Sequence, residues 1–179
     1  LNFGLSRSGM SAGSNPVSAS IPFHIWAEAI EKGEDMDEKR NAIQGLAENE
    51  TLGTNIKAVF SSTGNALINQ HSDINYTRKI LEDDSLCELI VVSDCWMTAT
   101  AKFADYVLPD STWVESNDLA NDSYASGEMG YLTFMSTQLE PLYNTKNLYN
   151  IGLELAREWG VEGAYTEGRT EEEWLEFLY

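Results

Sequence analysis

Residues 90–118 read IVVSDCWMTATAKFADYVLPDSTWVESND, and this stretch decides the fold. An apolar run, residues 89–92 (LIVV), ends at Ser93 and Asp94, and a segment of small residues, 98–101 (TATA), follows. A second short apolar run, residues 106–108, is stopped by Pro109. Short apolar runs between polar breaks are typical of strands buried in a parallel sheet. The stretch therefore predicts a strand, a polar tip, a short helix and a second strand, which together form a ligand-holding edge of an open α/β sheet.

The residues before this stretch repeat the alternation of strand and helix. Residues 56–61 (IKAVFS) have the pattern of a buried strand, and Asp73 is placed to cap a helix that runs to about residue 83. The elements that follow are expected to be strand 88–92, helix 99–104 with Thr98 as its cap, and strand 106–108. This order predicts parallel strands joined by right-handed crossovers. The expected fold class is a three-layer, doubly wound α/β domain with a mostly parallel sheet.

The flanking segments complete the expected organisation. Residues 1–20 are rich in Gly, Ser and Asn and are expected to be a loop or a cut end, with a single α/β domain over residues 21–179. The chain starts at Leu1, so we expect it to be a piece of a longer protein. The remaining predictions are helices over residues 23–32, 37–47, 145–159 and 171–179, a polar loop over 117–130 and a strand over 131–135.

Composition excludes several classes of function. The chain has 179 residues, 42% of them hydrophobic, and a formal net charge of −18. Nucleic-acid binding needs a basic surface, and anionic membranes repel an acidic one, so we expect no nucleic-acid partner. No apolar stretch approaches the ~20 residues of a membrane span, so we expect no direct membrane insertion.

The cysteines and the histidine give no catalytic or metal site. Cys87 and Cys95 flank one predicted strand and would lie roughly 26 Å apart, too far for a disulfide. Their spacing matches no metal motif. His71 has no nucleophile near it in the sequence, so it is assigned no acid–base role. We therefore name no catalytic residue and no metal ligand in this chain.

Two strand tips are the candidate binding site. Residues 61–65 (SSTGN) follow the first strand, and Ser93 and Asp94 follow the second, so parallel pairing places them at one edge of the sheet. Backbone N–H groups around Gly64 suit a phosphate, and the Asp94 carboxylate suits a ribose hydroxyl or a guanine N–H. This combination favours a nucleotide-like ligand. The alternative is that Gly64 only makes a turn and Asp94 only caps the segment after its strand.

Four blocks of sequence resemble one family. The strand ending in Asp94 and the segment 97–109 (MTATAKFADYVLP) resemble molybdopterin oxidoreductases of the dimethyl sulfoxide reductase family. The other blocks are 64–75 (GNALINQHSDIN), 121–125 with 129–132, and 166–170 (TEGRT). They occur in order over residues 20–179 and match part of the catalytic subunit in that family.

The resemblance implies a cofactor and the residues that contact it. The parent protein is expected to carry bis(molybdopterin guanine dinucleotide) molybdenum. By position in the matching blocks, the residues implied to contact it are Gly64, Asn65, Ile68, Asn69, His71, Ser93, Asp94 and Ser111. Because the family's metal ligand lies in an earlier part of the chain, this piece alone is expected to be soluble, inactive and without bound cofactor.

The resemblance also implies an activity and partners. The parent is expected to reduce S-oxides or N-oxides such as dimethyl sulfoxide in anaerobic respiration. Its expected partners are the remaining domains of the same chain, an iron–sulfur electron-transfer subunit and a membrane anchor subunit. The expected location is the outer face of the cytoplasmic membrane, after export. Two other classes stay open: a stand-alone nucleotide-binding or regulatory module, and a non-catalytic structural α/β domain.

Overall fold

The computed structural model describes residues 16–62, 64–69, 73–121 and 132–178. Contacts divide the chain into a first unit, Ser14–Leu108, and a second unit that contains Pro109–Tyr179. Each unit is described by itself. The loop expected over residues 1–20 falls almost wholly outside the described residues and stays a prediction.

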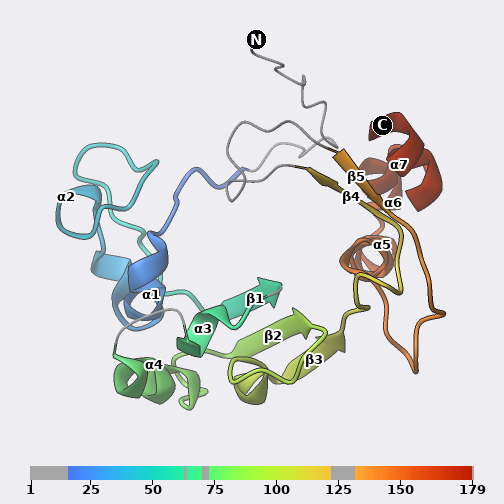
Figure 1. Cartoon of the computed structure of the whole chain (residues 1–179). Helices are drawn as coiled ribbons and strands as arrows, with labels where there is room; N and C mark the ends of the chain where they lie inside the picture. Colours follow the sequence, from blue (N-terminus) through green and yellow to red (C-terminus); the bar gives the residue numbers. More distant parts are fainter. Residues whose placement is uncertain (1–15, 63, 70–72, 122–131, 179) are drawn as a thin grey trace, which may run out of the picture. The chain divides into compact units, whose positions relative to one another are not determined.

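A three-stranded sheet organises the first unit. Its strands are β1 (Ala58–Ser62), β2 (Leu89–Asp94) and β3 (Tyr106–Pro109), in the order β1-β2-β3 (Figure 1). The first two strands are parallel, with Ala58 opposite Leu89 and Ser62 opposite Ser93. All three lie where the sequence predicts them, within two residues at each end. The parallel sheet confirms the α/β class.

Helices pack on one side of this sheet and make its core. They are η1 (Phe23–Ile25), α1 (Trp26–Lys32), η2 (Gly33–Asp35), α2 (Glu38–Asn41), α3 (Ala66–Asn69), α4 (Ile74–Leu81) and η3 (Ala101–Phe103). Ile30 of α1, Leu67 of α3 and Ile80 of α4 are buried with Ile90 and Val92 of β2. Asp73 accepts a hydrogen bond from the Tyr76 backbone N–H, which confirms it as the N-cap of α4.

Three local predictions for the first unit were wrong. The helix expected over residues 37–47 stops at Asn41, because Ala42 is left-handed at φ 54° and so ends the helix. The helix expected over 99–104 is a single 3-10 turn, although Thr98 does cap it through the Ala101 backbone N–H. The turn expected after Gly64 continues into the short helix α3.

The second unit contains an antiparallel strand pair and three helices. These are β4 (Asp118–Asn121), β5 (Leu132–Met135), α5 (Leu148–Glu158), α6 (Glu162–Thr166) and α7 (Glu171–Leu178). The loop expected over 117–130 is therefore wrong at its start, where β4 lies, and the rest of it is outside the described residues. The sequence also missed α6. It correctly predicted Thr170 as the cap of α7, where Thr170 and Glu173 exchange side chain–backbone hydrogen bonds.

Candidate functional site

The carboxyl ends of β1 and β2 lie side by side in the first unit. Since Ser62 is opposite Ser93, the segments that leave both strands begin at the same edge of the sheet. Gly64 and Asn65 follow β1, and Asp94 is the last residue of β2. Gly64 has φ +77°, a left-handed conformation that favours glycine, so its residue type is required by the turn. Four of the sequence-predicted site residues are thus held at one edge.

Thr100 fixes the shape of this edge and was not predicted. Its backbone N–H donates to Asn65 Oδ1 at 2.8 Å. Its Oγ1 accepts from the backbone N–H groups of Leu67 at 3.1 Å and Ile68 at 3.3 Å. The side chain is fully buried. Thr100 therefore caps the first turn of α3 from a distant part of the chain, a task that normally falls to a residue just before the helix.

Asp94 already makes one local hydrogen bond. The residue is 8% exposed, and its Oδ1 accepts from the Trp96 backbone N–H at 2.9 Å. This is the turn-forming role that the sequence left open as an alternative. An ionised carboxylate has several acceptor positions on its two oxygens, so one such bond does not use up its capacity.

Ser93 has a buried hydroxyl that the described residues do not satisfy. The residue is 0% exposed, and its Oγ has no hydrogen-bond partner among the residues that the structure describes. A buried hydroxyl left without a partner costs about 1–3 kcal/mol. Such an atom at the carboxyl end of a parallel strand suits a ligand that supplies the missing bond.

The other predicted residues are placed less favourably or are not placed. Ile68 is 7% exposed and packs in the core, so only its backbone faces the Thr100 contact. Asn69 ends α3 and is exposed. His71 lies outside the described residues. Ser111 belongs to the second unit and is described within that unit alone.

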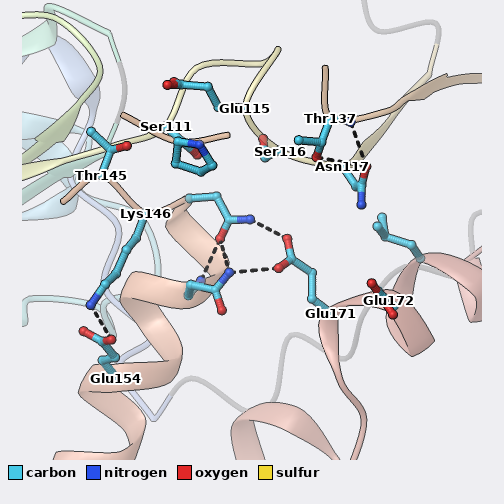
Figure 2. Close-up of a pocket in the computed structure, with 14 residues that line it drawn as sticks. Ser111, Glu115, Ser116, Asn117, Thr137, Thr145, Lys146, Glu154, Glu171 and Glu172 are labelled. Carbon is cyan, nitrogen blue, oxygen red and sulfur yellow. Dashed lines mark hydrogen bonds and ion pairs between the residues drawn. The ribbon is translucent and has the colours of Figure 1, made fainter. Parts of the chain in front are cut away.

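Ser111 lines a polar cavity of about 340 Å³ in the second unit. Its buried Oγ also has no hydrogen-bond partner among the described residues. Figure 2 shows Lys146 paired with Glu154, and Glu171 accepting hydrogen bonds from two asparagine amides, Asn147 and Asn150. The lining is therefore polar and already cross-linked by its own hydrogen bonds.

Glu115 holds the loop beside this cavity. Its carboxylate accepts from the backbone N–H and the hydroxyl of Thr112, at 2.8 and 2.7 Å, and from the Leu142 backbone N–H at 3.0 Å. These bonds favour the ionised form, so they hold the pKa of the Glu115 carboxyl below its usual value. Glu115 acts as a structural tie between residues 112 and 142.

The described parts of the chain supply no metal centre of their own. No group of three His, Cys, Asp or Glu side chains in them is placed to hold a metal ion. No helix in the same residues is long and apolar enough to cross a membrane.

Comparison with known proteins identifies the family. The profile of the molybdopterin oxidoreductase family matches residues 5–158. Dimethyl sulfoxide reductase DmsA of Escherichia coli (strain K12) is 46% identical over 165 residues, which are 92% of this chain and 20% of that protein. A trimethylamine-N-oxide reductase of Haemophilus influenzae is 38% identical over 126 residues, 69% of this chain and 14% of that protein.

A solved structure agrees with these relatives. Acetylene hydratase from Pelobacter acetylenicus superposes with a TM-score of 0.53 and 26% identity, over 76% of this chain and 15% of that one. The chain spans about a fifth of the length of the dimethyl sulfoxide reductases that it matches. Because the family profile covers most of its length and a sulfoxide reductase matches nearly all of it, this chain belongs to the molybdopterin oxidoreductase family.

Proposed function

We propose that this chain is the cofactor-binding segment of a molybdenum oxidoreductase that reduces S-oxides or N-oxides, with dimethyl sulfoxide as one substrate. The relatives that support this are named as dimethyl sulfoxide, trimethylamine-N-oxide and biotin sulfoxide reductases. When bound, the molybdenum cofactor would supply the two-electron, oxygen-atom chemistry, and the protein would position it. The complete catalytic polypeptide implied by this proposal is called the complete polypeptide below.

The buried hydroxyl of Ser93 carries the proposal. It lies at the tip of β2, beside Asp94 and across from the end of β1, and no described residue bonds it. A turn or a cap explains Gly64 and Asp94, but neither explains a fully buried hydroxyl that lacks a partner. A polar ligand that lies across the strand tips would satisfy it.

The remaining residues receive roles that follow from their chemistry. The turn at Gly64 and Asn65 would bring backbone N–H groups close to a phosphate. Asp94 would accept hydrogen bonds from the guanosine of a molybdopterin guanine dinucleotide. The further contacts implied by the family resemblance are Ile68, through its backbone, and Asn69, His71 and Ser111.

The proposal extends to the parent protein. Two guanine dinucleotide pterins would hold the molybdenum, and an iron–sulfur subunit with a membrane anchor subunit would deliver electrons during anaerobic respiration. The complete polypeptide would be exported and would sit at the outer face of the cytoplasmic membrane. Residues 21–179 would form one of its domains, and this chain alone would be soluble and inactive.

The test is Ser93→Ala in the complete polypeptide. If Ser93 bonds the cofactor, the variant should lose molybdenum and guanine nucleotide, while the cofactor-free protein should be as stable as the parent or more so, because an unsatisfied buried hydroxyl is removed. Both contents are measured by metal analysis and by nucleotide release, beside the unfolding midpoint.

Ser85→Ala is the matched control. Ser85 donates to Asp83 Oδ1 at 2.6 Å in the exposed turn before β2, away from the carboxyl edge. Its loss should lower stability slightly and leave the cofactor content unchanged. Full cofactor occupancy in Ser93→Ala, with a lowered midpoint, would show that the hydroxyl serves the fold and would remove the main support for the proposal.

A further inference from the structure

The two faces of the β1–β3 sheet are covered unequally. Side chains alternate along a strand, so Val59, Ile90 and Val92 share one face, and all three pack in the helix-covered core. Val107 packs against the same core, which places its neighbour Tyr106 on the opposite face. That opposite face, called the open face here, carries Ala58, Phe60, Leu89, Val91 and Tyr106.

The open face is apolar and exposed. Phe60 is 50% exposed, Leu89 37% and Tyr106 64%. Phe60 is directly opposite Val91, and Ala58 is opposite Leu89, so the side chains of β1 and β2 form a continuous surface. Parallel sheets occur almost only with both faces covered, because their crossover helices pack on both sides. A large apolar patch on such a sheet marks a contact surface.

The topology indicates which segment belongs on this face. The chain runs from β1 to β2 to β3 in one direction across the sheet, and the helical connections α4 and η3 both pack on the covered face. Right-handed crossovers place the helices of a sheet that grows in one direction on one face. Helices on the other face come from strands added in the opposite direction, which here means beyond β1. Among the described strands β1 lies at that edge.

We propose that the open face binds an amphipathic helix that comes from another segment of the same polypeptide, next to a strand that pairs with the free edge of β1. The inference rests on the proposed function, since it requires a longer catalytic chain. The relatives allow it, because this chain covers 92% of itself but only 20% of the matched reductase. A helix with a stripe of Leu, Ile or Val at the 3.6-residue period would fit the surface.

A photo-crosslinking experiment on the complete polypeptide tests the occupant. Phe60 is replaced by p-benzoylphenylalanine, a close analogue that keeps the aromatic ring, and the purified protein is irradiated and digested. The expected product joins residue 60 to a peptide of the same polypeptide that lies outside these 179 residues. The control carries the same label in place of Lys79, an exposed residue of α4, and should give little of that product.

Several products would overturn the inference. They are a crosslink to a second copy, to another subunit or to residues 109–179, and also a yield no higher than that of the control. Hydroxyl-radical footprinting of the unmodified protein guards against a label that disturbs folding. Phe60 and Tyr106 should be oxidised about tenfold more slowly in the folded than in the urea-unfolded protein, as sites that open rarely are. Equal rates in the two states would refute the proposed cover.

The two proposals fail separately in these measurements. Molybdenum content is recorded on the same samples, and the open face is distant from the strand tips in chemistry and in readout. A crosslink without any bound molybdenum would contradict the proposed function alone. Bound molybdenum without a crosslink or protection would contradict the covered face alone.

Discussion

Removal of the Thr100 hydroxyl should loosen the edge of the sheet at α3. In Thr100→Val the side chain keeps its branched shape, but the acceptor for the backbone N–H groups of Leu67 and Ile68 is lost. Both residues are buried, at 6% and 7% exposure, so water does not easily replace the missing oxygen. The backbone bond from Thr100 to Asn65 is retained, because it does not use the Thr100 side chain.

The magnitude follows from the two bonds. A buried donor left without a partner costs about 1–3 kcal/mol. The bond from Ile68 is long, so the pair together is expected to contribute about 2–4 kcal/mol to the local closed state. At 1.4 kcal/mol per factor of ten, opening of α3 should become roughly 30- to 700-fold more frequent. Because opening exposes the amides, their exchange with solvent should accelerate by the same factor.

Hydrogen exchange followed by mass spectrometry measures this in peptides that contain Leu67 and Ile68. Thr100→Ser is the matched control, because it keeps the hydroxyl and loses one methyl group. Its cost should be about 1 kcal/mol from lost burial. If Thr100→Ser accelerates exchange as much as Thr100→Val, the packing of the methyl group and not the capping oxygen holds α3, and the reasoning is wrong.

Three further predictions use other parts of the chain. In the complete polypeptide, Asp94→Asn keeps the oxygen that bonds Trp96 but removes the charge, so cofactor affinity should fall roughly ten- to hundredfold (about 1.5–3 kcal/mol) at an unchanged unfolding midpoint; an unchanged cofactor content would leave Asp94 with its turn role alone. For Glu115 the folded pKa lies below the unfolded value of 4.5, so its stabilisation is present above that value and is lost as the pH falls through the folded pKa. Unfolding midpoints of Glu115→Gln and the parent should therefore differ at neutral pH and converge in acid; a constant difference would contradict this. The isolated chain should bind no molybdenum and show no reductase activity with reduced viologen, and stoichiometric molybdenum in it would disprove that expectation.

The strands and the sheet edge were predictable because their signals are local. Residues 89–92 are apolar and are followed at once by polar residues, and β2 ends at Asp94 as that pattern indicates. The helix over 37–47 was mispredicted for a tertiary reason. The chain turns at Ala42, and Ile43 is then fully buried against Ala29 and Met36. The 3.6-residue period registers the apolar residues but not the direction from which they enter a core.

Helix α3 shows a second kind of limit. Residues 66–69 form only one turn, too short to be stable from its own propensity. Its first donors are satisfied by Thr100, which lies 33 residues after Leu67 in the chain. No window of sequence around α3 contains that partner. A hydroxyl in the small-residue segment 98–101 was the available signal, and it cannot be assigned to a helix elsewhere without the fold.

The residues at the strand tips differ in what they can decide. Gly64 and Asp94 have structural tasks that would be needed without any ligand, since one makes a left-handed turn and the other bonds Trp96. Their presence is therefore compatible with both a binding site and a plain loop. Ser93 differs because its hydroxyl is fully buried and no described residue satisfies it, at a cost of about 1–3 kcal/mol in the absence of a ligand. A residue without function at that position would be expected to be alanine, so the choice between the two interpretations rests on Ser93.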